Sequence, residues 1–202
     1  MLLLLSFCAV VAAVGSSTAL AQEDISREYT IKAAYLYNFG RYVTWPEGAF
    51  SEADTPFVIG VLGTDPFGEV LDTIAAEKKI EGRRIEVRRF ASLDQYTPCH
   101  ILFVNHSVDP EEQLDVIRRL GDSPVLLVGE TPAFAERGGV MNFFVEENKV
   151  RFEINPLAAE RAQLKISAKL RPLGVERSAA KTVREANTKA NVVPEPGLAQ
   201  EP

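Results

Sequence analysis

The sequence predicts an α/β fold: a single three-layer domain in which helices flank a mainly parallel sheet, with a β-hairpin near the carboxyl end. Two observations predict it. Continuous apolar runs at 57–62, 101–104 and 124–128 are typical of strands covered on both faces, and segments of helical periodicity separate these runs. Strands that alternate with helices favour a parallel sheet. The about 180 residues that follow residue 21 suffice for one domain with a hydrophobic core.

The first expected element is a helix in the stretch 29–46, which reads YTIKAAYLYNFGRYVTWP. Pro46 ends it, because the residue before a proline is pushed away from the helical region. Tyr37 falls on the polar side with Arg41, which makes these two residues the first candidates for contact with a partner. The alternative is a tyrosine whose ring packs on a neighbouring loop. The expected apolar arc comprises Ile31, Tyr35, Leu36, Phe39, Tyr42 and Val43.

A strand-turn-helix unit follows at 57–75. Asp65 is expected to cap the helix with Pro66 at the first helical position. Asp65 also follows the end of a predicted parallel strand, the edge where ligands of such folds bind. The capping role explains this residue most simply.

Residues 83–90 alternate apolar with charged side chains as far as Val87, as a half-exposed strand does. The four arginines of this segment indicate an edge strand whose charges prevent pairing with other chains. Arg84 and Arg88 are also the second candidates for partner contact, because a basic patch suits an acidic partner or anionic lipid.

The next unit begins with the buried strand 101–104. Asp109 then supplies a helix cap, with Pro110 at the first helical position and a reciprocal carboxylate near the third, and the helix runs to Leu120. After the strand at 124–128, a short helix is expected from Thr131 to the glycines at 138–139.

The pattern then changes to a hairpin, with strands at 140–145 and 150–154. Asn155 caps a further helix rich in small residues, which can approach the sheet closely. Residues 164–167 fit either a short last strand or a continuation of that helix. Periodicity does not decide between the two.

The two ends of the chain differ in composition from the centre. Residues 1–21 carry no charge and end in Ala-Leu-Ala, which predicts a cleaved secretory signal, with a membrane anchor as the alternative. The mature domain is then 22–173 and is expected to be exported. Residues 174–202 lack nearly all large apolar side chains, so a disordered tail is expected.

Composition restricts the chemistry. The net charge of −6 disfavours general nucleic-acid binding. Cys8 leaves with the signal, so Cys99 has no intramolecular disulfide partner, and with two histidines a zinc site is hard to assemble. Cys99 and His100 do not form a dyad, because neighbours on a strand point to opposite faces. The sequence predicts no catalytic residue, no cofactor and no metal site.

The order and spacing of several motifs resemble the YfiR-like family of small bacterial periplasmic proteins from about Tyr29 to Leu170. Two departures stand out: the paired cysteines of disulfide-bearing members are absent, and residues 167–173 interrupt what is more often a continuous helix. The motifs are IKAAYLYNFGRYVTWP, VLGTDPFG, GRRIEV, CHILFV and GETPAFAERGGVMNFFVEENKVRFEINPLAAERAQLKIS.

This resemblance implies a non-enzymatic regulator that represses the periplasmic sensor domain of an inner-membrane diguanylate cyclase or a related signalling protein. It also implies that an envelope signal or an outer-membrane lipoprotein releases the regulator from the sensor domain. The resemblance leaves open whether the chain forms a homodimer. The alternative is a small-molecule sensor or carrier with a crevice at Asp65, His106 and Glu130. A third hypothesis is an enzyme of unrecognised type.

Overall fold

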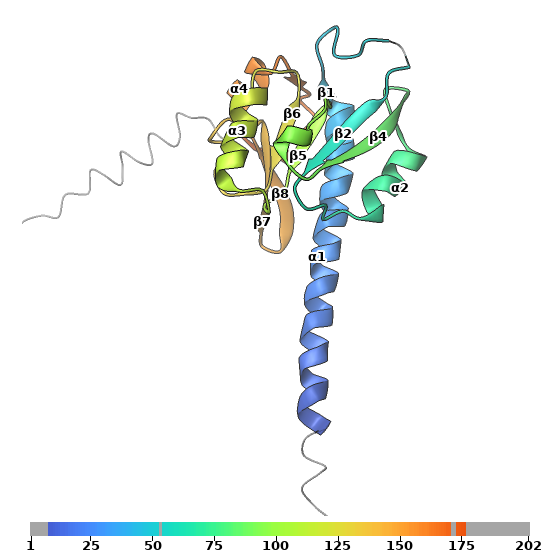
Figure 1. Cartoon of the computed structure of the whole chain (residues 1–202), viewed down its shortest axis with the longest axis vertical. Coiled ribbons are helices and arrows are strands. Elements are labelled where there is room, and N and C mark those ends of the chain that lie inside the picture. The colour runs from blue at the N-terminus through green and yellow to red at the C-terminus, as the bar shows by residue number, and fades with distance from the viewer. Residues whose placement is uncertain (1–7, 53, 171–172, 177–202) are drawn as a thin grey trace, which may run out of the picture.

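The computed structural model describes residues 8–52, 54–170 and 173–176 (Figure 1). Within them, one sheet has the order β10-β8-β7-β6-β5-β2-β4-β3, and β1 pairs with β9 in a separate two-stranded sheet. The strands are β1 Val43–Thr44, β2 Phe57–Leu62, β3 Lys79–Ile80, β4 Arg83–Phe90, β5 Ile101–Val104, β6 Leu126–Gly129, β7 Met141–Glu146, β8 Lys149–Ile154, β9 Lys165–Ile166 and β10 Val175–Glu176. The helices are α1 Cys8–Tyr42, α2 Glu69–Glu77, α3 Pro110–Leu120 and α4 Pro156–Arg161, with a 3-10 turn, η1, at Leu93–Gln95.

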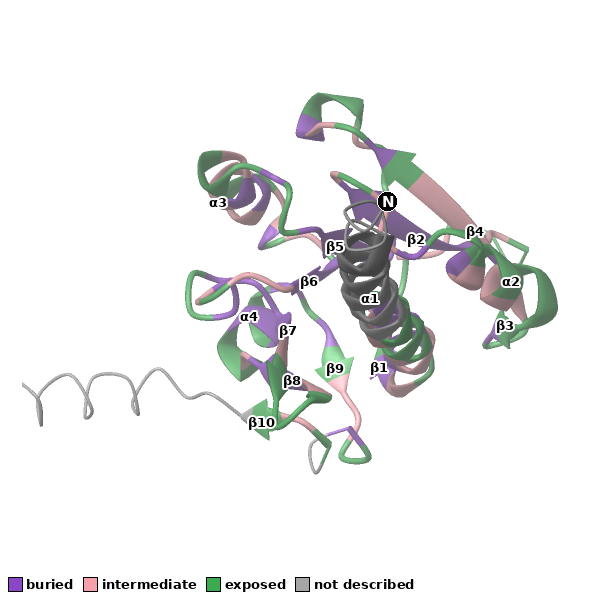
Figure 2. Ribbon diagram, turned by 90° about the horizontal axis from the view of Figure 1, so that it is seen from below, coloured by how far each residue is buried: buried purple, intermediate pink, exposed green. Residues whose placement is uncertain are grey.

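The main sheet is mostly parallel, which confirms the predicted fold class. Strands β4, β2, β5, β6 and β7 run parallel, and β8 returns antiparallel to β7. Two apolar clusters cover its two faces. Side chains of α1, α2 and α4 contribute to the first, and side chains of η1 and α3 to the second. Figure 2 shows α1 and α3 on opposite sides of the central strands.

Helix α1 ends earlier than the sequence predicts. It stops at Tyr42, because Val43 and Thr44 leave the helix to pair with β9. The predicted apolar arc is also partly wrong, since Ile31 is 37% exposed while Lys32 is buried. The helix is continuous through Ala21, the predicted cleavage point, and its amino-terminal half extends away from the sheet (Figure 1). No helix in the described part of the chain is long and apolar enough to cross a membrane.

The predicted cap at Asp65 is wrong. The Asp65 carboxylate accepts a hydrogen bond from the Phe67 backbone N–H at 2.8 Å and pairs with Arg89 at 2.7 Å. Arg89 also pairs with Asp72 of α2. Because these contacts stabilise a turn over residues 65–68, α2 begins only at Glu69, after Gly68.

The predicted helix at 131–138 is also absent, and turns replace it. Ala133 and Gly138 have positive φ values of 64° and 123°, which interrupt a right-handed helix. The ring of Phe134 instead packs directly on Gly129 and Gly139, where a Cβ atom would lie 2.3 Å from it. Both glycines are required for this close approach.

Two other helix caps are confirmed. Asp109 accepts a hydrogen bond from the Glu111 N–H, and Asn155 accepts one from the Ala158 N–H. The reciprocal carboxylate is not found at the first of these caps, because Glu112 accepts from the Leu93 N–H instead.

The hairpin is confirmed in β7 and β8. Its two loop residues, Glu147 and Asn148, both have positive φ, as a tight turn that matches the strand twist requires. Residues 165–166 form a strand, which settles the alternative left open by periodicity. Strand β10 pairs with β8 beyond the expected boundary at Leu173. The rest of the predicted tail, 177–202, and residues 1–7 of the predicted signal lie outside the described residues.

Candidate functional site

Two of the three residues predicted for a ligand crevice meet at the carboxyl edge of the sheet. His106 follows β5 and Glu130 follows β6, and His106 Nδ1 lies 2.8 Å from Glu130 Oε1. The third, Asp65, instead forms an ion pair with Arg89 of β4, the strand on the other side of β2 from β5. The side chain of Glu130 is 3% exposed, whereas that of His106 is 65% exposed. The carboxylate is therefore a buried charge beneath a surface histidine.

Helix α1 supplies the cation that neutralises this carboxylate. Lys32 Nζ lies 2.7 Å from Glu130 Oε2 and 2.5 Å from Glu28 Oε1, and its side chain is 4% exposed. The ammonium group also lies 4.5 Å from the centre of the Tyr29 ring. Residues 98 positions apart in the sequence thus form a buried ion pair between α1 and the sheet.

The remaining oxygen of Glu130 accepts several further hydrogen bonds. Asn105 Nδ2 donates at 2.8 Å, the His106 backbone N–H at 3.0 Å and the Tyr29 hydroxyl at 3.3 Å. We call Glu28, Tyr29, Lys32, Asn105, His106 and Glu130 the Glu130 network. Lys32 is not among the residues predicted from the sequence, although its spacing from the buried residues Tyr29 and Leu36 places it on the buried side of the helix.

Electrostatics keep Glu130 ionised. Burial alone would raise its pKa, but Lys32 and the His106 donors outweigh burial and hold that pKa below its usual range. Burial and the Glu130 charge raise the pKa of the Tyr29 hydroxyl, which therefore stays protonated and donates. Lys32 engages one oxygen of Glu130, and groups of Tyr29, Asn105 and His106 engage the other. These contacts fasten α1 onto the sheet.

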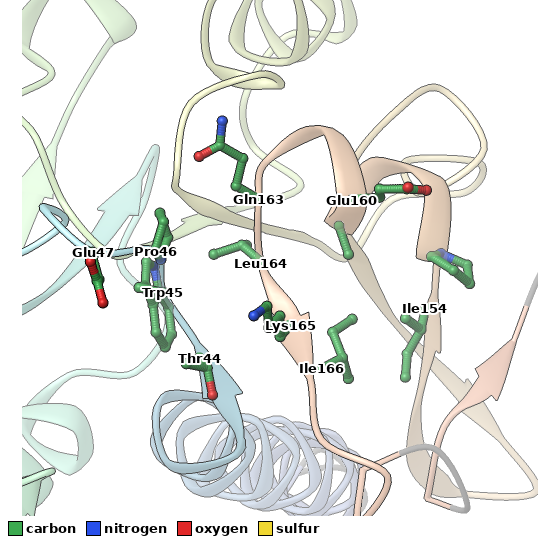
Figure 3. A pocket seen from close by; sticks show the side chains of 12 residues that line it. Thr44, Trp45, Pro46, Glu47, Ile154, Glu160, Gln163, Leu164, Lys165 and Ile166 are labelled. Carbon is green, nitrogen blue, oxygen red and sulfur yellow. The ribbon is translucent and has the colours of Figure 1, made fainter.

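A separate cavity of about 890 Å³ lies near the opposite edge of the sheet (Figure 3). One wall consists of Trp45, Pro46 and Glu47, which follow α1 and β1. The other wall consists of Ile154 and residues of α4 and β9, including Leu164. None of the three residues predicted for a ligand crevice lines this cavity. This cavity therefore lies away from the site that the sequence suggested.

The first predicted partner residues form an exposed basic and aromatic surface. The guanidinium group of Arg41 lies 5.6 Å from the Tyr37 ring and 5.4 Å from the Tyr42 ring, and Lys169 Nζ lies 5.9 Å from the Tyr42 ring. Tyr37 is half-buried against the first core, whereas Arg41 and Lys169 are exposed. Within the described residues, no carboxylate lies within ion-pair distance of Arg41. We call Tyr37, Arg41, Tyr42 and Lys169 the Arg41 patch.

The second predicted partner residues, Arg84 and Arg88, lie on the other face of the sheet. Ile85 and Val87 pack in the core beneath α1, and side chains alternate along a strand, so their neighbours point away from α1. Both arginines pair with Glu86, and Arg88 also donates to the Pro98 carbonyl. The structure therefore does not bring the two pairs of candidates together on one surface.

Cys99 and His100 do not form a dyad. Cys99 is buried in the second core, and burial raises the pKa of its thiol to about 12, which disfavours reaction with a second chain. The His100 ring contacts backbone groups and aromatic rings instead. In the part of the chain that the structure describes, no group of three or more His, Cys, Asp or Glu side chains could hold a metal ion.

Comparison with protein families gives one extensive match. The model of the family described as YfiR/HmsC-like matches residues 29–175, which include α1 from Tyr29, the whole Glu130 network except Glu28, and the Arg41 patch. No curated protein matches the chain.

Among solved structures, a conserved domain protein from Vibrio cholerae O1 biovar El Tor is similar at 12% identity with a TM-score of 0.45. The match covers 60% of this chain and 55% of the other, so the chain spans about half the length of that protein.

Proposed function

Because this chain belongs to the YfiR/HmsC-like family, we propose that it is a periplasmic, non-enzymatic regulator that binds and represses the sensor domain of a membrane signalling protein. The partner that we propose is the periplasmic domain of an inner-membrane diguanylate cyclase or a related signalling protein. The family match over residues 29–175 is the observation that carries the proposal. The mechanism is a population shift, in which the regulator binds the inactive arrangement of the sensor more tightly than the active one.

An envelope signal or an outer-membrane lipoprotein would compete the regulator away from the sensor. Export through a cleaved signal at residues 1–21 and a mature domain of about 150 residues belong to the same proposal.

A change in cellular cyclic di-GMP tests the proposed regulation of the cyclase. Expression of the full chain in a strain that carries the diguanylate cyclase encoded beside it is expected to lower the cellular level of cyclic di-GMP and the amount of biofilm. An unchanged level of cyclic di-GMP would contradict the proposal.

The Arg41 patch is the surface that we assign to the partner. The Arg41 guanidinium group is exposed and has no carboxylate within ion-pair distance among the described residues, so it can bind an acidic side chain without breaking an ion pair of that part of the chain. The tyrosine rings on either side hold it in place and supply amphipathic contact area. Arg84 and Arg88 are less suited, since both already pair with Glu86 and an existing ion pair would have to break or be shared.

Arg41→Glu is expected to weaken partner binding by at least about tenfold, as the loss of a central arginine contact commonly does. Arg84→Glu is the matched control, because it makes the same charge change on the opposite face of the sheet and should leave the affinity nearly unchanged. Titration of both variants against the sensor domain measures the difference. Equal affinities would remove the Arg41 patch from the interface, and a selective loss in Arg84→Glu would move the interface to β4.

The cavity beside Trp45 favours a second candidate function, a small-molecule sensor or carrier. Native mass spectrometry of the purified full chain tests it. A stoichiometric bound metabolite that is lost on Leu164→Trp, which narrows the cavity, would favour this candidate over the regulator without a ligand.

A further inference from the structure

The side of α1 that faces away from the sheet carries a stripe of five residues. They follow one another at intervals of four, three, four and three positions, which is the spacing of the seam between two paired helices. We call this stripe the α1 seam; its members are Arg27, Ile31, Ala34, Asn38 and Arg41. Four of them are exposed and Asn38 is half-buried.

The α1 seam is accessible to another helix. At about 100° per residue, it is centred about 180° from the buried side of α1, to which Leu36 and Phe39 belong. Ile31, in the middle of the seam, is 37% exposed although it is a large apolar residue. The exposed isoleucine on an otherwise polar stripe is the feature that calls for a partner.

A second copy of the same helix fits the α1 seam when the two helices are antiparallel. With the two-fold axis midway between positions 31 and 34, Ile31 of each copy faces Ala34 of the other. Arg27 then faces Asn38 of the second copy, and its guanidinium group can donate to the Asn38 side-chain oxygen. Each large side chain therefore meets a smaller one, and the contact is the same on both copies, as a two-fold interface requires.

The charges of α1 favour this orientation over a parallel one. In a parallel pair, Arg27 would face Arg27 and Arg41 would face Arg41, and like charges repel. In the antiparallel pair, Arg41 faces positions 23–24 of the second copy, which are Glu and Asp in the sequence. Because Arg41 has no ion-pair partner within the described residues, this contact breaks no ion pair of that part of its own chain.

The length of the helix fits as well. Removal of residues 1–21 would leave the helical residues 22–42, and the same axis places position 22 opposite position 43 of the second copy. The overlap therefore extends over the whole remaining helix, about 32 Å at about 1.5 Å per residue. The amino-terminal part of α1, which extends away from its own sheet in Figure 1, would lie along the helix of the second copy.

We propose that the α1 seam is a docking surface for a second copy of this chain, which packs its own α1 against it in antiparallel orientation. Only two of the five seam residues are apolar, so the dimer is a weak one that dissociates on dilution. The pair covers Arg41, and self-association therefore excludes use of the Arg41 patch by another protein. The dimer itself does not depend on the proposed partner.

Sedimentation of the exported, purified chain from about 5 μM to about 500 μM tests the dimer. We expect a reversible shift from monomer to dimer. Ile31→Glu puts a carboxylate opposite Ala34 and should weaken self-association at least about tenfold, with an unchanged circular dichroism spectrum. Leu157→Glu is the matched control, because Leu157 is an exposed aliphatic residue of α4, outside the seam, and should have no effect.

A chain that stays monomeric over this range would overturn the proposal. A dimer that persists in Ile31→Glu, or that is lost equally in Leu157→Glu, would also overturn it.

Disulfide crosslinking tests the orientation. Ile31→Cys and Ala34→Cys are mixed and oxidised, with an affinity tag on one of them to identify mixed dimers. The native Cys99 is buried and does not compete. The antiparallel pair predicts that the mixed disulfide between positions 31 and 34 forms in preference to disulfides between identical variants. A preference for identical variants, which parallel helices give, or no crosslinked dimer at all would contradict the proposal.

Discussion

Lys32→Met is expected to lower the free energy of unfolding by roughly 3–5 kcal/mol at neutral pH, the usual cost of leaving one partner of a buried ion pair uncompensated. The variant keeps most of the side-chain volume but leaves the Glu130 carboxylate, 3% exposed, without its cation. The loss should shrink towards acidic pH, because protonation of Glu130 then removes the unpaired charge. Urea unfolding followed by circular dichroism measures both effects.

The double variant Lys32→Met/Glu130→Gln is the control for this result. Glutamine keeps an oxygen that can accept from Asn105 Nδ2 and the His106 N–H, while the buried charge is gone. It should therefore recover most of the stability lost in the single variant, since replacing a buried pair by neutral groups is often tolerated. A double variant as unstable as Lys32→Met would show that the charge at Glu130 is not the cause.

Phe39→Ala is the second large effect, with an expected loss of about 3–5 kcal/mol. The Phe39 side chain is fully buried and contacts three other rings between α1 and the hairpin. Its centroid lies 4.9 Å from that of Phe152, 5.6 Å from that of Phe143 and 6.0 Å from that of Tyr35. Alanine would leave a cavity among rings that cannot all move inward. Thermal and urea unfolding measure the loss.

Ile31→Ala on the same helix is the matched control. The sequence pattern places Ile31 on the apolar arc with Phe39, but the structure exposes 37% of it. Its replacement should change the free energy of unfolding by no more than about 0.5–1 kcal/mol. A loss equal to that of Phe39→Ala would mean that something covers Ile31 in solution.

The sequence predicts the parts of the fold that depend on local chemistry. The buried strands β2, β5 and β6 appear as continuous apolar runs, and Asp109 and Asn155 cap the helices that their following prolines begin. It fails where a tertiary contact overrides the local preference. Asp65 could cap a helix, but Arg89 and the Phe67 N–H engage it, and the pairing of β1 with β9 ends α1 four residues before Pro46.

The candidate site likewise contains residues that a local sequence pattern predicts and one that depends on a distant contact. Glu130 and His106 are predictable because both lie within two residues of the end of a buried parallel strand, and the carboxyl ends of these strands share an edge of the sheet. Lys32 is a lysine on an amphipathic helix, and most lysines in that setting are solvated. Its burial depends on a carboxylate 98 residues away, and no local pattern contains that information. The packing of residues 45–52 on the sheet is likewise not predictable from a local pattern, because the stacking of Phe50 on His100 joins residues 50 positions apart.

The most direct test of the regulator assignment is titration calorimetry of the purified chain, including α1, against the periplasmic domain of the membrane cyclase or sensor encoded beside it. The assignment predicts saturable binding with a dissociation constant of about 1 μM or lower, equivalent to about 8 kcal/mol of binding free energy, and weaker binding for Arg41→Glu. No heat of binding and no co-elution with any such domain would contradict it.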